Sequence, residues 1–198
     1  MTAAQYTTLA PWMADPPDGR EREREHALAV AARDGDADAF AALVRANQQR
    51  AYAVARAIVL SHEDAEDAVQ DGFLHAYRAL DRFRPEQAFS GWLHRIVANA
   101  ALDILRRRKV RLTEELRDSI PMPFRDPGED DELRRRLAEG LARLPDRQRA
   151  VLVLHDVEGF RHGEIGAMLD IPEGTARSDL HHARGAMRMA LHNMRSDS

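Results

Sequence analysis

The sequence contains no cysteine and few aromatic residues, which make up 6% of its 198 residues. Without cysteine neither a disulfide framework nor a thiolate metal site can form, and a reducing compartment is the default expectation. No apolar run approaches the length of a membrane span, and the N-terminus lacks a basic segment followed by an apolar core. We therefore expect a cytoplasmic protein that does not insert into a membrane.

The sequence also lacks the excess of positive charge that is typical of proteins that coat nucleic acid. Its 29 basic and 33 acidic residues give a net charge of -4. Affinity for phosphate comes from Lys and Arg, so such proteins are usually strongly basic. Any DNA binding must therefore depend on local basic patches or on a partner that supplies the phosphate contacts.

The sequence motifs that mark common enzyme classes are absent. There is no glycine-rich phosphate loop, no HExxH and no Gly-x-Ser-x-Gly. The adjacent His181 and His182 would diverge by about 100° on a helix, which makes them a poor metal-binding pair. We predict neither a catalytic residue nor a metal or other cofactor.

Composition and periodicity predict an all-α protein, because Ala, Leu, Arg, Glu and Asp dominate and β-branched residues are sparse. Helical spacing of apolar residues predicts two small domains, at residues 31–110 and 133–194. Between them, residues 111–132 carry eight acidic residues, three arginines and three prolines, which predicts an extended acidic linker. Residues 1–30 are predicted to form a flexible arm.

Three helices are expected to bury one another in the first domain. The first begins near Asp36, where the apolar periodicity starts. Ser61 is a candidate N-cap for the second helix, with Asp64 completing an imperfect capping box. Pro85 interrupts the pattern, after which Ser90 offers a cap for the third helix.

The most informative segment spans residues 164–190. A short helix, a tight connection through Pro172 and Gly174, and a longer helix from Thr175 are typical of a helix-turn-helix. The second helix of this motif enters the major groove with its N-terminal residues toward the bases. Arg177 and Ser178 fall in its first turn, and Arg177 can bind guanine edges. Alone, the pattern equally fits a helical hairpin with solvated arginines.

Two charged patches lie in the first domain. The run at residues 106–109 ends the third helix, and the upstream rings Phe83, Phe89 and Trp92 suit stacking with unpaired bases. The cations could instead satisfy the helix dipole, and the rings could be core. The second patch, residues 63–71, is acidic and cannot face phosphate. It is either a solvated face or a docking site for a basic partner.

Taken together, these segments resemble the extracytoplasmic-function (ECF) group of the sigma-70 family. The run DAEDAVQDGFLHAYRALDRF followed by FSGWLHRIVANAALDILRRR resembles region 2 in order, spacing and residue type. The run LPDRQRAVLVLHDVEGFRHGEIGAMLDIPEGTARSDLHHAR resembles region 4. The resemblance covers roughly residues 36–110 and 133–192, on either side of the acidic linker.

The resemblance implies an RNA polymerase sigma factor, which gives the core enzyme its promoter specificity and catalyses nothing itself. Region 2 is implied to dock on the polymerase clamp helices and to capture the melted minus-ten element. Region 4 is implied to bind the polymerase flap and to recognise the minus-thirty-five element as duplex, while the acidic linker threads toward the RNA exit path. An anti-sigma factor is a further candidate partner, and the free chain is expected to be a monomer.

The residues implied for each role follow from the matched positions. Polymerase binding falls to Asp64, Asp67, Gln70 and Asp71. Minus-ten binding falls to Arg82, Phe83, Phe89, Ser90, Trp92, Arg95, Asn99, Asp103, Arg106 and Arg107. Minus-thirty-five binding falls to Thr175, Arg177, Ser178, His181, His182 and Arg184.

The chain departs from the family pattern at three places in region 4. Asp179 stands where a second basic residue is usual, so Asp179→Arg is expected to tighten binding to duplex promoter DNA. His181 and His182 replace a polar or aromatic residue and an arginine, which puts the minus-thirty-five sequence in doubt. Gly166 replaces alanine, at a cost of about 1 kcal/mol in helix propensity.

Two rival functions remain open. A stand-alone helix-turn-helix regulator would bind duplex DNA tightly without polymerase, usually as a dimer. A protein-interaction module would leave Arg177 and Arg184 without any role in promoter output.

Overall fold

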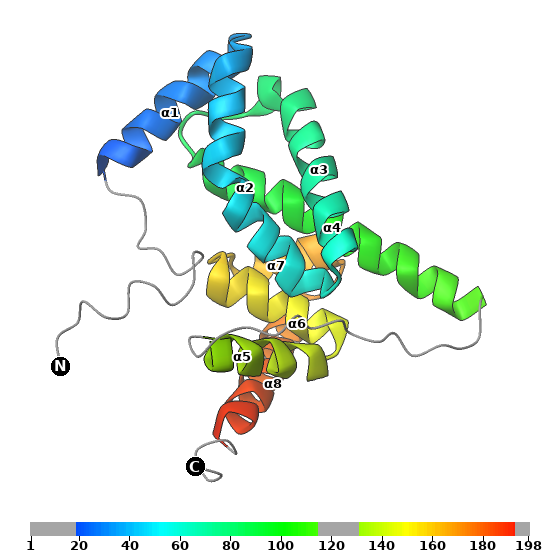
Figure 1. Cartoon of the computed structure of the whole chain (residues 1–198). Coiled ribbons are helices and arrows are strands. Elements are labelled where there is room, and N and C mark those ends of the chain that lie inside the picture. The colour runs from blue at the N-terminus through cyan, green and yellow to red at the C-terminus, as the bar shows by residue number, and fades with distance from the viewer. Residues whose placement is uncertain (1–18, 115–130, 193–198) are drawn as a thin grey trace, which may run out of the picture.

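The computed structural model describes residues 19–114 and 131–192, and all regular secondary structure in these two ranges is helical (Figure 1). This confirms the predicted all-α class. The helices are α1 (Gly19–Arg33), α2 (Ala37–Val59), α3 (His62–Arg78), α4 (Phe89–Glu114), α5 (Asp131–Arg143), α6 (Asp146–Leu152), α7 (His162–Leu169) and α8 (Glu173–His192). A 3-10 turn at Leu80–Arg82 and a π-helical turn at Val153–Val157 complete the list.

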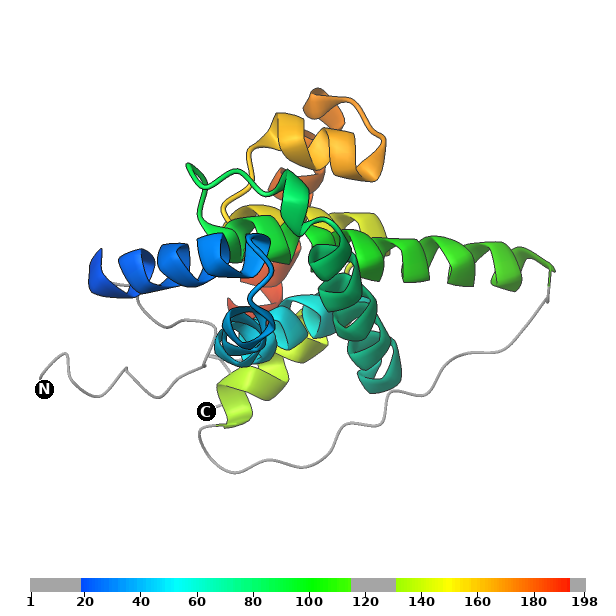
Figure 2. The ribbon, with the colours of Figure 1, turned by 90° about the horizontal axis from the view of Figure 1, so that it is seen from above.

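The helices form two bundles that touch. Helices α1 to α4 pack together as the first bundle, and α5 to α8 as the second. The two bundles meet where α2 contacts α6 and the π-helical turn. Figures 1 and 2 show the C-terminal half of α4 projecting beyond the body of the molecule. The two bundles therefore pack against each other.

The starts of α2 and α3 follow from their capping residues, and the cap at Ser61 confirms the prediction from the sequence. The Asp36 carboxylate accepts the backbone N–H groups of Asp38 (2.9 Å) and Ala39 (3.0 Å). The Ser61 hydroxyl accepts the backbone N–H of Asp64 at 3.3 Å. Both caps satisfy amide groups that have no partner within the helix.

The predicted cap at Ser90 is wrong. Helix α4 already begins at Phe89, and the backbone N–H of Trp92 bonds the Ala88 carbonyl at 3.2 Å. Ser90 therefore lies inside the first turn, where its hydroxyl donates to the Glu25 carboxylate of α1 at 3.4 Å.

The predicted domain boundaries also need correction. Residues 19–30 belong to α1 and not to a flexible arm, because Ala29 and Ala32 are buried against the first bundle. Small alanines give a weak periodic signal but permit close packing. The predicted linker is shorter at both ends, since α4 runs to Glu114 and α5 begins at Asp131. Residues 1–18 of the arm and 115–130 of the linker lie outside the described residues.

A close crossing of α3 and α4 holds the first bundle together. At Gly72 an added Cβ would lie 2.6 Å from Val97 Cγ2 and 2.9 Å from Val97 Cα. Because the second of these atoms is backbone, no side-chain rotation can relieve the clash. Only glycine fits at this crossing.

Gly72→Ala should therefore destabilise the chain by about 1–3 kcal/mol, because the two helices must separate to make room. Gly91→Ala is the matched control, since it lies at the start of α4 with nothing within 4 Å of its added Cβ. Chemical denaturation monitored by circular dichroism would measure both. Equal free energies of unfolding for the two variants would contradict this account.

Candidate nucleic-acid interface

Helices α7 and α8 form the predicted helix-turn-helix, with a connection of only Asp170, Ile171 and Pro172. Asp170 ends α7 in the left-handed conformation at φ 54°. The Ile171 backbone N–H bonds the Gly166 carbonyl at 2.9 Å, which folds the connection back onto α7. A Cβ at Gly166 would lie 2.8 Å from the Ile171 carbonyl oxygen. The predicted cost of Gly166 in helix propensity is therefore accompanied by a packing role, because a side chain at this position would crowd the turn.

The second helix of the motif begins two residues earlier than the sequence predicted, at Glu173. Arg177 and Ser178 therefore follow its first turn, although both stay exposed in its N-terminal half. The Arg177 guanidinium pairs with Glu173 one turn before it, at 2.8 Å. His181, His182 and Arg184 are also exposed, and Thr175 is half-buried. Leu180 and Ala183 of the same helix are buried, so α8 presents one polar face to solvent.

Arg184 is held by an acidic residue of the π-helical turn. Its Nη2 lies 2.5 Å from Asp156 Oδ1 and its Nε 3.0 Å from Asp156 Oδ2. This hydrogen bond and charge lower the pKa of Asp156 and raise that of Arg184. The pair sets the direction of the Arg184 side chain on the polar face of α8.

Asp179 does not lie on that polar face. It is only 5% exposed, and Arg147 at the start of α6 donates to its carboxylate from Nε at 2.6 Å. This bond and the charge of Asp179 raise the pKa of Arg147. This arrangement argues against the expectation that Asp179→Arg would tighten DNA binding, because Asp179 is buried and ties α8 to α6 instead of lying on the exposed face.

A strip of polar residues runs along α4. Arg95, Asn99, Asp103, Arg106 and Arg107 are all exposed, and spacings of four and seven residues put the first four near one helix face. Arg106 Nη1 lies 2.5 Å from Asp103 Oδ1, and Arg107 Nε donates to the Asp103 carbonyl at 3.3 Å. Arg82 is exposed in the 3-10 turn nearby along the chain.

The three aromatic rings beside this strip pack on one another. Ring centroids lie 5.5 Å apart for Phe83 and Phe89, 5.3 Å for Phe83 and Trp92, and 5.5 Å for Phe89 and Trp92. Phe83 and Phe89 are buried, whereas Trp92 is half-buried. In this structure neither phenylalanine ring is available to stack on a base, because both are core. Only Trp92 retains an accessible surface.

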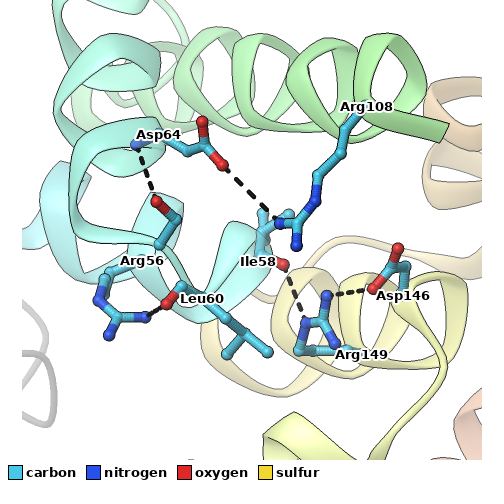
Figure 3. A network of polar contacts seen from close by, with 8 residues as sticks. Arg56, Ile58, Leu60, Asp64, Arg108, Asp146 and Arg149 are labelled. Atoms are coloured by element: carbon cyan, nitrogen blue, oxygen red, sulfur yellow. Dashed lines mark hydrogen bonds and ion pairs between the residues drawn. The ribbon is translucent and has the colours of Figure 1, made fainter. Parts of the chain in front are cut away.

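The acidic patch lies on the exposed side of α3. Asp67 and Gln70 are exposed, and Asp71 is half-buried. Asp64 is oriented within the chain, since its Oδ2 lies 3.9 Å from an Arg108 nitrogen of α4 (Figure 3). Asp67 and Gln70 therefore remain free to meet a partner.

Two residues that the sequence did not single out join the bundles. Arg149 of α6 is 3% exposed and donates to the Ile58 carbonyl of α2 at 2.9 Å and to the Leu144 carbonyl at 3.1 Å. Its third contact is the Asp146 carboxylate at 2.5 Å (Figure 3). Burial lowers the pKa of Arg149, against the opposing effect of Asp146. Its only sequence signal is an arginine directly before the apolar run of residues 150–154.

Glu158 is the second of these residues, and its carboxylate is 3% exposed. His94 Nδ1 of α4 lies 2.8 Å from its Oε2, and Arg50 Nε of α2 lies 3.5 Å from its Oε1. Burial alone would raise the pKa of Glu158, but the hydrogen bond and charge of His94, together with Arg50, lower it on balance. These three side chains form a cluster between the bundles, in which Glu158 and His94 are buried and Arg50 is partly exposed.

Within residues 19–114 and 131–192, no three acidic or histidine side chains gather in a way that could hold a metal ion. None of the described helices is long and apolar enough to cross a bilayer. Two helical bundles that carry a helix-turn-helix and a second polar strip define a protein of the DNA-binding class.

The comparisons with known proteins specify the class further. The sequence matches Sigma-70 region 2 over residues 43–111 and Sigma-70, region 4 over residues 134–187. It is 38% identical over 153 residues to the ECF RNA polymerase sigma factor SigM of Mycobacterium tuberculosis, covering 77% of each chain. It is 32% identical over 169 residues to SigW of Bacillus subtilis, covering 79% of this chain and 90% of that protein.

A solved structure of CnrH in complex with the cytosolic domain of CnrY is also similar. Its TM-score is 0.58 at 30% sequence identity, over 86% of this chain and 98% of that one. The chain belongs to the sigma-70 family. It is an ECF sigma factor, which confirms the predicted family. The comparisons therefore support a sigma factor and not a stand-alone regulator.

Asp179→Arg should destabilise the second bundle by about 3 kcal/mol or more, because it places a buried cation against Arg147. His182→Arg is the control, since it places the same arginine side chain on the exposed side of α8, with a charge change of one instead of two. Thermal unfolding should show a lower midpoint for the first variant only. Tighter binding of Asp179→Arg than of the wild type to a random 30-base-pair duplex pool at fixed salt would restore the earlier expectation.

The free energy of unfolding should decrease as the pH is lowered, because Glu158 becomes protonated. Because its pKa is lower in the folded than in the unfolded chain, ionised Glu158 stabilises the fold above the ordinary carboxyl pKa of about 4.3. This stabilisation is lost as the pH falls through the folded pKa. Urea denaturation between about pH 3 and 6 should show that the free energy of unfolding depends less steeply on pH in Glu158→Gln than in the wild type. The exposed Glu63→Gln controls for the lost charge, and equal slopes in all three proteins would refute the assignment.

Proposed function

We propose that this sigma factor docks on core RNA polymerase through α3, captures the minus-ten strand on α4 and recognises the minus-thirty-five duplex with α8. The observation that carries the proposal is the separation of charge among three surfaces. Exposed acidic residues lie on α3, and exposed arginines lie on two other helices, α4 and α8. A chain with a net charge of -4 can then recognise a promoter if polymerase supplies most of the phosphate contacts.

The polymerase surface is proposed to consist of Asp67, Gln70 and Asp71, with Asp64 at its edge. An exposed acidic helix is repelled by DNA and attracted by a basic protein surface. The pairing of Asp64 with Arg108 links this surface to α4, which carries the minus-ten residues. Docking of α3 would therefore also orient α4.

The minus-ten surface is proposed to comprise Arg82, Trp92, Asn99 and Arg107, together with Arg95 and Arg106. Trp92 can stack on an unpaired base, and the buried rings of Phe83 and Phe89 hold it in place. Extruding a base costs a few kcal/mol, which binding can offset without nucleotide hydrolysis. We infer that the chain acts by binding alone, in the cytoplasm where bacterial polymerase works.

The minus-thirty-five surface is proposed to be the polar face of α8. Arg177, Ser178 and His181 lie nearest the turn, where a recognition helix meets base edges. His182 and Arg184 follow them along the helix, where phosphate contacts are expected.

A protein partner that holds the sigma factor inactive is proposed in addition. CnrH was solved in complex with the cytosolic domain of CnrY, so a protein of this family binds another chain. In our structure a mainly apolar groove opens between the bundles, lined by Tyr52 of α2 and Leu60 directly after it, Leu137 and Leu141 of α5, and Met187 of α8. An apolar segment of an anti-sigma factor would fit this groove.

The proposed function is tested by run-off transcription with purified core polymerase, on promoters that the wild-type holoenzyme selects from a random template library. Asp67→Ala should weaken binding to core polymerase about tenfold, because it removes an exposed charge from the docking surface. Arg177→Ala should keep polymerase binding but reduce run-off product about tenfold, in line with the loss of one bidentate base contact.

Two exposed residues outside the proposed surfaces serve as controls, Asp38→Ala on α2 and Arg143→Ala on α5, and both should behave as wild type. A chain that is indifferent to core polymerase would overturn the proposal. So would wild-type transcription by the Asp67 and Arg177 variants.

A further inference from the structure

We propose that Glu173 is a specificity-determining residue of the minus-thirty-five surface. Its carboxylate accepts a hydrogen bond from the N4 amino group of a cytosine, within two base pairs of the guanine that Arg177 binds. This inference deepens the proposed function and rests on it, because it takes the polar face of α8 to be the surface that recognises the minus-thirty-five duplex.

Glu173 is the first residue of α8 and lies on its exposed face. Its side chain is 56% exposed, and that of Arg177 is 68% exposed. Glu173, Arg177 and His181 follow one another at intervals of four residues, so they form one stripe along the helix. The residues next to Glu173 cover little of this turn, since Gly174 has no side chain and Thr175 is half-buried. A duplex that meets the first turn of α8 therefore meets Glu173.

The backbone of Glu173 is held in place by α7. An added Cβ at Gly166 would lie 3.5 Å from the Glu173 backbone nitrogen and 3.6 Å from its Cα, so the two helices approach closely here. The bond from the Ile171 backbone N–H to the Gly166 carbonyl fixes the connection directly before α8. A contact from a position that is already fixed avoids part of the free-energy cost of ordering on binding. Glu173 is therefore presented on a rigid part of the motif.

Glu173 and Arg177 form an ion pair in which both partners keep the capacity to bind a base. Arg177 Nη2 donates to Glu173 Oε1 at 2.8 Å, while Glu173 Oε2 bonds to no residue that the structure describes. A guanidinium has five N–H donors, and this pair uses one of them. Arg177 can therefore bind guanine O6 and N7 while the second carboxylate oxygen of Glu173 accepts another hydrogen bond. The ion pair fixes the two side chains relative to each other.

The charge of Glu173 limits what it can face in DNA. It is the only exposed acidic residue of α8, because Asp179 is buried. Phosphate repels a carboxylate, and so do the acceptor atoms of guanine and thymine in the major groove. Only cytosine and adenine present an amino group there, and the amino group of adenine lies beside the acceptor N7. Cytosine is therefore the base that suits a carboxylate at this position.

The spacing of the ion pair sets the distance between the two bases. Residues four apart on a helix have their Cβ atoms about 5–6 Å apart. Successive base pairs are about 3.4 Å apart along the duplex. The cytosine should therefore lie within two base pairs of the guanine that Arg177 binds.

A purely structural role for Glu173 predicts a different behaviour. A negative charge in the first turn of a helix is favourable to the helix dipole whether or not DNA is bound. Loss of that role would lower the stability of α8 and the amount of active protein, but it would leave the ranking of promoter sequences unchanged. A change of base preference at a single position therefore distinguishes base recognition from helix stabilisation.

The test uses the holoenzyme that the full chain forms with core polymerase. One promoter that the wild type selects from a random library is randomised over its minus-thirty-five region, and each template carries a downstream barcode that the run-off transcript copies. Sequencing of the transcripts gives the base preference at every randomised position, as a ratio that does not depend on how much of a variant is active. The wild type should prefer cytosine at one position, within two base pairs of a guanine whose preference is lost in Arg177→Ala.

Glu173→Gln should lose the cytosine preference and favour adenine at the same position, because a carboxamide binds adenine N6 and N7. The ratio of adenine to cytosine should rise about tenfold, in line with the discrimination by one base contact. Asp170→Asn is the matched control, because it removes the same charge from an exposed residue three positions earlier. Asp170 has φ 54°, a conformation that asparagine tolerates, so this variant should keep every wild-type preference.

Failure of this inference can be told apart from failure of the proposed function. If Arg177→Ala loses a guanine preference but Glu173→Gln keeps all wild-type preferences, α8 recognises the duplex without Glu173 and the inference is overturned. It is also overturned if the wild type shows no cytosine preference within two base pairs of that guanine. A third contrary result is that Glu173→Gln weakens only the guanine preference, because Glu173 then only positions Arg177. If Arg177→Ala changes no preference, the assignment of α8 to the minus-thirty-five element fails, and the inference fails with it.

Discussion

The carboxylate of Glu158 is buried at the junction of the two bundles, and much of the architecture depends on its being paired. An ionised carboxylate without partners costs several kcal/mol in a protein interior. Its partners Arg50 and His94 come from two different helices of the first bundle, so one charge fixes the second bundle against both. Separation of the two bundles would expose Glu158, Arg50 and His94 to solvent together, and water could then replace the pairing. The three groups are therefore paired when the bundles are in contact and hydrated when the bundles are apart, and in neither state is a buried charge left without a partner.

The distribution of charge explains how an acidic protein can serve promoter recognition. Acidic residues are exposed on α3, whereas the arginines of α4 and α8 are directed by carboxylates of this chain, such as Asp156 beside Arg184. Internal pairing reduces the pull of free arginines on arbitrary DNA. In the proposed function, a DNA contact by Arg184 would have to replace its internal partner Asp156.

Local signals in the sequence predicted local structure well and long-range contacts poorly. The helix start near Asp36, the cap at Ser61 and the helix-turn-helix were predictable because capping and helical spacing involve neighbouring residues. Glu158 and Arg149 were not, because their partners lie on helices far away in the sequence. Periodicity could not decide whether Phe83 was core or base-stacking, since it lies in the connection between α3 and α4 and belongs to no helical pattern. Asp179 looked like a DNA-facing residue because the sequence does not show Arg147 beneath it.

Three of the contacts between the bundles end on backbone oxygen atoms, those of Ile58, Val157 and Met168, with arginines as the donors. A carbonyl group is present whatever side chain a position carries. Substitutions at these three acceptor positions can therefore accumulate over evolution without deleting the hydrogen bonds, provided that the backbone conformation is unchanged. Arg149, Arg50 and Arg106 have no such freedom, so we expect the closed arrangement to constrain relatives through its donors far more than through its acceptors.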